Sequence, residues 1–273
     1  MAKSYLFPEH LVETLGAWLL GLLWMLPLLY AAWTAFHPAI FATRFDLLAP
    51  VTLGNLIEAW QAAPFARYLI NTVTLVTLIL AAQFVVCTLA AFAFARMVFP
   101  GRNLLFAIVL LQLMVAPDVL LVENYRTIVR LHLADTILAI ALPYLGSAFG
   151  IFLLRQTFLT VPQALDDAAR LEGCSLLGRL WRIYVPLAKP TYIAYGLVLV
   201  SYHWNNFLWP LVITNSVTTR PLTVGLAVFA TTDQGIDWSI VTAATLMTSM
   251  PLLIAFLLFQ RQFVHSFMRA GIR

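Results

Sequence analysis

Residues 160–190 read TVPQALDDAARLEGCSLLGRLWRIYVPLAKP, a charge-rich stretch between long apolar segments. The pattern predicts a helix over 161–172, followed by a second short helix. Gly173 lies between them and can adopt the left-handed conformation that often ends a helix. Ser175 can cap the second helix, and Pro186 is expected to end it, because proline disrupts a helix interior. A helix–glycine–helix unit is therefore expected in this loop.

The first helix of the pair carries its own local signals. Thr160 and Gln163 have the S/T-x-x-E/Q spacing of a capping box, so Thr160 is expected to cap the N-terminus. Asp166 and Arg170 have opposite charges and are four residues apart, a pairing that stabilises a helix modestly. Both features support a helix over 161–172.

One side of this helix is small, and charged residues surround it. Ala168 and Ala169 would let a partner surface approach closely, while Asp167, Arg170 and Glu172 would offer charged contacts. An alternative is an interfacial helix that lies on lipid headgroups. Acidic residues at the start of the helix disfavour anionic lipids, since interfacial helices are usually rich in Lys and Arg. A docking site for another protein is therefore the favoured interpretation.

The composition of the 273 residues is that of a membrane protein. Hydrophobic residues make up 62% and charged residues 10%, with a mean hydropathy of +0.89. Soluble globular domains have roughly 45–50% apolar and about 25% charged residues. These values exclude a cytosolic enzyme, a disordered tail and a nucleic-acid-binding domain. The net charge of +4 is explained by Lys and Arg retained on the cytoplasmic side.

Six apolar segments are long enough to cross the membrane, which takes roughly 20 helical residues. Asp118 interrupts the third near its far end. The first contains Pro27 and no A-x-A site follows it, so it is expected to stay as an anchor. A short interfacial helix is expected over 53–60. The six segments are 15–36, 68–95, 103–122, 136–154, 190–219 and 238–260.

The distribution of Lys and Arg predicts the orientation of these segments. With the N-terminus inside, eleven of the 16 lie on cytoplasmic segments and five on the opposite side. Cytoplasmic loops carry an excess of Lys and Arg, so both termini are expected in the cytoplasm. The expected organisation is a cytoplasmic N-terminus (1–14), a six-helix transmembrane domain (15–265) that includes a cytoplasmic loop (155–189) and a periplasmic loop (215–237), and a cytoplasmic tail (266–273).

No pattern in the chain indicates catalysis or a resident metal. Cys87 and Cys174 are too few for a disulfide framework and lack C-x-x-C spacing. There is no H-E-x-x-H motif, and neither Lys3 nor Lys189 completes a G-x-x-x-x-G-K nucleotide-binding loop. We therefore expect no catalytic residue, no metal site and no cofactor on this chain. Any ATP hydrolysis must come from another subunit.

Polar side chains within an apolar segment are candidates for a transport path, because such groups usually face a bundle interior or a water-filled cavity. The fifth segment holds a dense set. Amides can hydrogen-bond hydroxyls, and indoles can stack on sugar rings. The alternative is that the tryptophans belong to the outer aromatic belt and that Pro210 only kinks the helix. The candidate path residues are Tyr202, Trp204, Asn205, Asn206 and Trp209.

Other polar groups in the spans have simpler explanations. Gln83 and Gln112 are explained at least as well by hydrogen bonding between helices. Asp118 and Glu123 lie near the outer end of the third segment, where long polar side chains can reach water.

The 160–190 loop resembles the EAA loop of binding-protein-dependent ABC importer permeases. That loop reads E-A-A, two residues, D-G-A and, after a spacer, I-x-L-P. Residues 167–169 (DAA) match E-A-A, 172–174 (EGC) match D-G-A, and Ile183 and Pro186 match I-x-L-P. The resemblance implies a coupling element that docks in a cleft of an ATPase subunit. The residues implied in coupling are Asp166, Asp167, Ala168, Ala169, Arg170, Glu172, Gly173, Cys174 and Pro186.

Three more segments resemble the carbohydrate-uptake branch of that family, the smaller maltose-type and the glycerol-3-phosphate-type permease subunits. They are 64–71 (PFARYLIN), 91–101 (AFAFARMVFPG) and 203–210 (HWNNFLWP). The resemblance implies an all-α type I ABC importer permease fold, multi-pass in the bacterial inner membrane, that works by alternating access. The implied partners are a dimer of ATPase subunits that holds ATP and Mg, a second homologous permease, a periplasmic or lipid-anchored solute-binding protein and membrane lipid, with no nucleic acid.

By position, the resemblance places the binding protein against 215–237 and the ATPase pair against 266–273. The expected function is the permease subunit of an importer of a sugar or sugar-like solute: an oligosaccharide, a monosaccharide or glycerol phosphate. A non-sugar solute remains an alternative, because the EAA loop is shared across substrates. A secondary transporter is the other alternative. A proton-coupled carrier usually holds acids or histidines at mid-membrane, whereas only His203 lies inside a span here.

Overall fold

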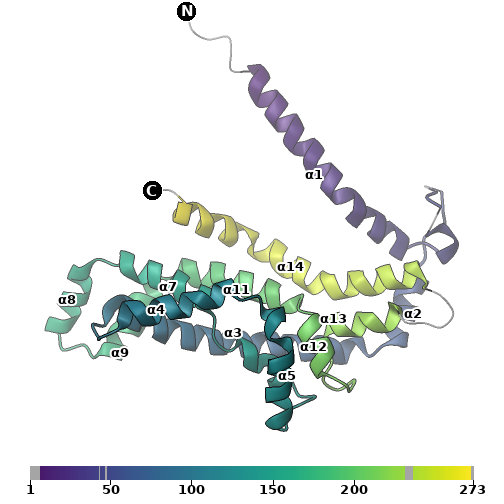
Figure 1. The fold of residues 1–273 in the computed structure, drawn as a ribbon. Coiled ribbons are helices and arrows are strands. Elements are labelled where there is room, and N and C mark those ends of the chain that lie inside the picture. The colour runs from purple at the N-terminus through teal and green to yellow at the C-terminus, as the bar shows by residue number, and fades with distance from the viewer. Residues whose placement is uncertain (1–6, 43, 47, 231–235, 272–273) are drawn as a thin grey trace, which may run out of the picture. The chain divides into compact units, whose positions relative to one another are not determined.

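The structure, a computed structural model, describes residues 7–271 except positions 43, 47 and 231–235. The described chain is helical throughout and contains no strand (Figure 1). The all-α class predicted from the apolar segments is therefore confirmed.

The helices follow the order of the predicted segments. The first half holds α1 (Phe7–Ala35), α2 (Gly54–Ala62), α3 (Phe65–Arg96), α4 (Arg102–Leu111), α5 (Leu121–Arg130), α6 (Ile137–Ala141) and α7 (Ala148–Thr160). The second half holds α8 (Gln163–Leu171), α9 (Leu176–Arg179), α10 (Val185–Leu187), α11 (Lys189–Trp204), α12 (Leu208–Ile213), α13 (Leu222–Leu226) and α14 (Trp238–Gly271). Short 3-10 turns are η1 (Ala39–Phe41), η2 (Gln112–Met114), η3 (Pro117–Leu120), η4 (Leu142–Tyr144) and η6 (Ala227–Ala230), and η5 (Leu180–Tyr184) is a π-helical turn.

Three helical stretches are long and apolar enough to cross a membrane: Leu11–Ala35, Phe65–Arg96 and Trp238–Leu258. In three further cases, two shorter helices reach the required length and hydropathy only when they are taken together, and each such pair is bent at a short break. The described residues therefore hold three spans, or up to six if each bent pair crosses as one. The bent pairs are Arg102–Met114 with Pro117–Arg130 (91°), Ile137–Tyr144 with Ala148–Thr160 (50°) and Leu176–Leu187 with Lys189–Trp204 (76°).

The breaks have local causes. The residue before a proline is disfavoured in the α region, so Ala116, which precedes Pro117, is extended with ψ 133° and interrupts the third expected segment. In the fourth, Ser147 starts a new helix by accepting a hydrogen bond from the Gly150 N–H at 3.2 Å. The fifth breaks after Trp204, where α11 ends.

The chain divides into two compact units. The first comprises residues up to Pro64 together with Leu226–Met250. In this unit the short helix expected over 53–60 is present as α2. Its Asn55 side chain donates to the carbonyls of Ala35 at 3.0 Å and His37 at 2.8 Å, which fastens α2 to the end of α1.

The second unit, Phe65–Gly225 and the residues from Pro251, contains the candidate site. Helices α7 and α11 approach closely at Gly150, where a Cβ atom would lie 2.2 Å from the Tyr195 hydroxyl, so only glycine fits. Gln83 on α3 is buried. It donates to the Tyr144 carbonyl at 2.6 Å and accepts from the Tyr195 hydroxyl. Hydrogen bonding between helices, predicted for Gln83, is confirmed.

Candidate functional site

The loop after α7 forms two short helices with a glycine between them, as predicted. Gly173 has φ +76°, the left-handed conformation. Its N–H donates to the Arg170 carbonyl at 3.0 Å, and the Cys174 N–H donates to the Ala169 carbonyl at 2.9 Å. This pair of bonds is the Schellman arrangement, which satisfies carbonyls at the end of a helix. The turn between α8 and α9 is therefore fixed by its own backbone.

The predicted cap of the first helix is wrong, whereas that of the second is confirmed. Thr160 still belongs to α7 and its hydroxyl donates back to Thr157, so it is not available to α8. Helix α8 begins at Gln163 without a side-chain cap. Ser175 accepts from the Gly178 N–H at 3.1 Å and caps α9.

Pro186 does not end the second helix as expected, because the chain continues helically to Leu187. A proline inside a helix cannot donate to the carbonyl four residues earlier and its ring crowds that carbonyl. Here the preceding turn, η5, is π-helical, and such wide turns are local departures from the α-helical hydrogen-bond register. The sharp change of direction falls one step later, between Leu187 and Lys189.

A buried cluster of charges holds α8 against α9. The Asp166 side chain is fully buried and accepts two bonds from Arg179 Nη1, at 2.9 and 2.8 Å. Arg170 Nη2 reaches the same carboxylate at 2.9 Å, as the i,i+4 spacing predicted. Arg179 is nearly buried, whereas the Arg170 side chain is 51% exposed. A buried carboxylate must be paired to be tolerated, and these two arginines pair it.

Arg96, the last residue of α3, joins that helix to the loop. Its guanidinium donates to the carbonyls of Phe158 at 2.7 Å and Val161, and to the Gln163 side chain at 2.8 Å. It also lies 5.1 Å from the centre of the Tyr184 ring, a cation–π distance. One side chain thus touches the end of α7, the start of α8 and the π-turn.

The residues implied in coupling divide into an outward and an inward set. Asp166 and Ala169 are buried within the loop, so neither can present the contact surface that was expected of it. Cys174 is partly buried. Leu171, which sequence reasoning did not single out, is 91% exposed. The exposed set consists of Asp167, Ala168, Arg170, Glu172, Gly173 and Pro186.

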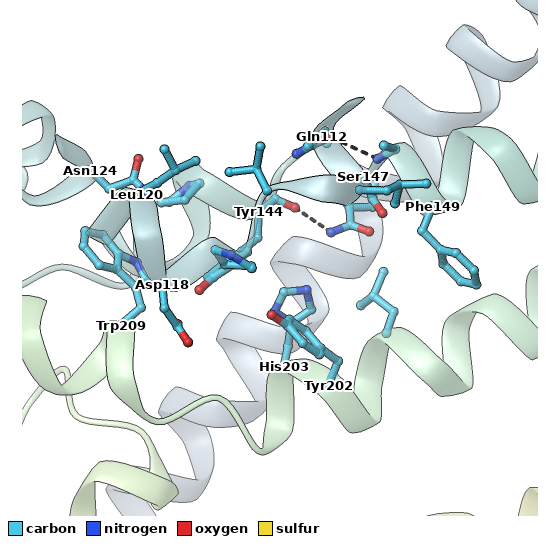
Figure 2. Close-up of a pocket in the computed structure, with 18 of the residues that line it drawn as sticks. Gln112, Asp118, Leu120, Asn124, Tyr144, Ser147, Phe149, Tyr202, His203 and Trp209 are labelled. Atoms are coloured by element: carbon cyan, nitrogen blue, oxygen red, sulfur yellow. Dashed lines mark hydrogen bonds between the residues drawn. The ribbon is translucent and has the colours of Figure 1, made fainter. Parts of the chain in front are cut away.

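A cavity of about 380 Å³ opens between the ends of the broken helices of the second unit (Figure 2). It is mainly apolar, with hydroxyl and amide groups on its wall. Of the candidate path residues, Tyr202 and Trp209 line it. The other polar or aromatic lining side chains are Gln83, Gln112, Asp118, Asn124, Tyr144, Ser147, Phe149, Tyr195 and His203.

Trp204, Asn205 and Asn206 do not line the cavity. Trp204 is buried, and the Asn205 side chain donates to the Ser201 carbonyl at 2.8 Å, one turn back in its own helix. The Asn206 carbonyl accepts from the Thr223 hydroxyl at 2.7 Å. The Asn206 side chain hydrogen-bonds to Tyr144, a residue of the cavity wall.

Some polar groups of the cavity wall are already satisfied. The Ala148 N–H donates to Gln112 Oε1 at 3.2 Å, and Trp209 Nε1 donates to the Ile140 carbonyl at 3.2 Å. His203 differs. Its ring is buried edge-on against Tyr144 and Tyr202, with centroids 4.8 and 5.0 Å away, and its Nδ1 has no partner among the described residues.

A second aspartate organises the other side of this unit, between α5 and α6. Asp135 has φ +59°. Its Oδ1 accepts from the backbone N–H groups of Asn215 at 2.9 Å and Ser216 at 3.1 Å, and from the Thr219 hydroxyl. Partial burial alone would raise the pKa of Asp135. The hydrogen bonds from Thr219, Ser216 and Asn215 outweigh burial and lower that pKa to about 2.

The turn held by Asp135 is also tied to α3. Asn71 Nδ2 donates to the carbonyls of Thr218 and Arg220, both at 2.9 Å, and Arg67 Nε donates to the Thr218 carbonyl at 3.1 Å. The start of the expected periplasmic loop 215–237 is thereby fixed. Residues 231–235 of that loop, residues 1–6 of the N-terminus and the side chains of the tail 266–273 lie outside the described residues.

No protein-family model matches the chain, but related proteins do. The arabinooligosaccharides transport system permease protein of Halalkalibacterium halodurans is 30% identical over 266 residues, which cover 95% of each chain. The sn-glycerol-3-phosphate transport system permease protein of Pectobacterium atrosepticum is 32% identical over 254 residues, 88% of this chain and 90% of its own length. The chain belongs to this family of sugar ABC-importer permeases.

A solved structure shares the fold of this permease. It is a bacterial ABC transporter involved in the import of the acidic polysaccharide alginate, with a TM-score of 0.83, 20% identity and coverage of 96% of this chain and 100% of that chain. A second structure, of the alginate transporter with an alginate pentasaccharide-bound periplasmic protein, has a TM-score of 0.64 and 18% identity over 92% of this chain and 96% of that chain.

Sequence patterns did not single out three side chains that organise the permease: Arg96, Arg179 and Asp135. Each makes its bonds to residues more than ten positions away. No local spacing signals such pairs. The need for a buried counter-charge beside Asp166 follows from the burial of Asp166, and the sequence alone does not show that burial.

Proposed function

We propose that this permease crosses the bacterial inner membrane six times, with both termini in the cytoplasm, and couples ATP hydrolysis by other subunits to import of a sugar or sugar-like solute. Support for six crossings comes from the three long helices, from the two bent pairs within 102–130 and 137–160, and from the apolar segment 190–219, which α11 and α12 occupy. Support for the orientation comes from the eleven-to-five bias of Lys and Arg. Names of relatives that transport arabinooligosaccharides and glycerol 3-phosphate support the solute class.

The observation that carries the coupling role is the α8–Gly173–α9 unit. Asp166 and its two arginines make it one rigid body, and Arg96 fastens that body to the long helix α3. A force on the exposed side of α8 is therefore delivered to a membrane helix. Asp167, Ala168, Arg170 and Glu172 would meet the ATPase, while Asp166, Ala169, Gly173, Cys174 and Pro186 would keep the shape that presents them.

The remaining parts of the importer would be supplied by partners. A dimer of ATPase subunits would hold ATP and Mg, and this chain would bind no cofactor. A second homologous permease would complete the translocation path, to which this chain contributes the cavity lined by Tyr202 and Trp209. A solute-binding protein would deliver cargo at the outer face, where Asp135 fixes the turn 215–220. The alginate transporter in complex with its periplasmic protein supports such a partner.

Two measurements test this function. A tagged permease co-expressed with its genetic neighbours should co-purify with an ATPase whose hydrolysis rises when the cargo-loaded binding protein is added. Reporter domains fused after Arg273 should be active only in the cytoplasm, and those inserted within 215–237 only outside. Purification without any ATPase, or periplasmic activity of the C-terminal fusion, would contradict the proposal.

A further inference from the structure

The cavity wall has an unusual balance of charge for a family with both neutral and anionic solutes. Among the described residues that line it there is no Lys and no Arg, and the carboxylate of Asp118 carries a formal negative charge. Proteins usually recognise carboxylates and phosphates with arginine or lysine. A wall with one acid and no such cation disfavours an anion by direct repulsion.

Helix N-termini could replace cationic side chains, because their free N–H groups bind anions. Helix α7 starts at this wall, but two of its first N–H groups are already bonded. The Ala148 N–H donates to Gln112 and the Gly150 N–H to Ser147. The helical stretch that starts at Pro117 carries Asp118 in its first turn, which places a negative charge at that end. Two N–H groups of the first helix start are thus already occupied, and the Asp118 carboxylate disfavours an anion at the second.

The groups that remain suit hydroxyls. Tyr202 and Asn124 contribute a phenol and an amide to the wall, and Tyr144 a phenol that also hydrogen-bonds to the Asn206 side chain. The His203 ring lines the cavity, and its buried Nδ1 has no partner among the described residues. A hydroxyl both donates and accepts, so it can satisfy that nitrogen in either tautomer. In Figure 2, His203 and Tyr202 lie together on one side of the space that Asp118 and Tyr144 also border.

We infer that the cavity of this permease accepts uncharged, polyhydroxylated solutes and rejects anionic ones, with Asp118 as the residue that excludes anions and His203 as a hydroxyl-binding residue. This inference rests on the proposed transport function. It separates this chain by cargo charge from relatives named for glycerol 3-phosphate and from the alginate transporter.

The test uses the assembled complex with its ATPase and second permease, held with a non-hydrolysable ATP analogue and without binding protein. Two probes share the same trisaccharide ring system and differ at C6, which is a neutral hydroxymethyl group in galactotriose and a carboxylate in trigalacturonate. Calorimetry should show galactotriose binding at least about tenfold more tightly, a difference of roughly 1.4 kcal/mol. Glycerol 3-phosphate serves as a second anionic probe and should not bind.

Three variants make the inference sharper. Asp118→Arg should strengthen trigalacturonate binding until its affinity equals or exceeds that of galactotriose. Glu123→Arg makes the same charge change outside the cavity wall, where Glu123 pairs with Arg126 at 3.0 Å, and should leave the preference unchanged. His203→Phe keeps an aromatic ring but removes the buried nitrogen, and should weaken galactotriose binding without admitting the anion.

The inference is overturned if trigalacturonate binds as tightly as galactotriose, if galactotriose does not bind, or if Asp118→Arg and Glu123→Arg behave alike. Failure of the proposed function is a separate result, because it is read from ATPase retention and ATP-dependent uptake by the same preparations. A complex that hydrolyses ATP on stimulation yet prefers the anion would retain its function and lose only this inference.

Discussion

Two aspartates in the same compact unit are held in different ways. Asp166 is completely buried in the α8–α9 loop and lies against two arginines, Arg179 and Arg170. Asp135 is only partly buried, and its Oδ1 receives two backbone N–H groups and a hydroxyl. One carboxylate is neutralised by opposite charge and the other is stabilised by neutral donors.

The difference follows from burial. A carboxylate without water must be paired, and the loss of one member leaves the other as an uncompensated charge. A carboxylate near water needs only oriented donors, and its loss leaves groups that water can satisfy. The inner cluster should therefore be brittle, as suits the coupling role proposed for it. The outer cluster should open more easily, as suits the contact with a solute-binding protein proposed for its turn.

The largest effect is expected for Asp166→Leu. This change leaves Arg179 buried without a counter-charge, and removing one partner of a buried pair costs about 3–5 kcal/mol. Protease protection of the loop and retention of the ATPase should both fall. Replacement of both partners in Asp166→Leu/Arg179→Met should recover much of the loss, since apolar replacement of a buried pair is often tolerated. A double variant as unstable as the single one would show that the pair is not the cause.

The next effect is expected for Asp135→Asn, which removes the charge that its three donors stabilise. Hydrogen bonds to charged groups contribute about 1.5–3 kcal/mol, so the turn 215–220 should loosen locally while the inner loop stays intact. A spin label on V217C, where Val217 is 47% exposed, would report increased mobility. An immobile label in the variant would contradict the role of Asp135 in fixing this turn.

The same label tests the pH dependence of the outer cluster. The pKa of Asp135 is lowered from 3.8 to about 2 in the folded protein. Its stabilising contribution is therefore fully present above the unfolded pKa and is lost as the pH falls from about 4 towards 2. The parent should hold the label rigidly at pH 7 and release it in that acid window. Asp135→Asn should show mobility at pH 7 and no further change through the window.

A fourth prediction separates shape from charge in the inner cluster. Gly173 has φ +76° and open space around its Cβ position, so Gly173→Val introduces backbone strain of roughly 1–2 kcal/mol without a clash. The strain should re-aim α8, so ATPase retention and uptake are lost although membrane insertion is normal. Gly101→Val is the matched control, because Gly101 has φ +77°, is equally open and lies outside the loop. Equal loss in both variants would point to general instability.

Local patterns predicted the parts of this molecule that depend on neighbours in sequence. The turn at Gly173, the cap at Ser175 and the Asp166–Arg170 pair are all present. The predicted cap at Thr160 failed because α7 runs one turn further than its apolar residues suggest. What could not be read from spacing is set by tertiary packing, such as the approach of Arg179 to Asp166 across the turn.

The cavity wall also combines residues that local patterns predicted with residues that only tertiary packing places there. Tyr202 and Trp209 were found from their residue type in an apolar segment, and both line it. Asn205 and Asn206 were expected beside them, but neither lines it: the Asn205 side chain bonds within its own helix, and the Asn206 side chain bonds to Tyr144, which does line the cavity. Gln112 bonds to another helix as expected, through the Ala148 N–H, and the bend at Pro117 brings both Gln112 and Asp118 to the cavity wall. The break in the helix thus gives these residues a place on the wall that spacing alone did not predict.

The smallest effect on stability is expected for Arg170→Ala. Arg170 contacts the same carboxylate as Arg179, that of Asp166. Half of its side chain is exposed, and exposed ion pairs contribute about 0–1 kcal/mol. Loop protection should therefore be nearly unchanged, whereas Arg179→Ala should reduce it strongly. If Arg170 also meets the ATPase, its removal weakens ATPase retention without loss of stability, and Arg170→Lys partly restores it. A stability loss equal to that of Arg179→Ala would mean that burial does not decide which arginine holds Asp166.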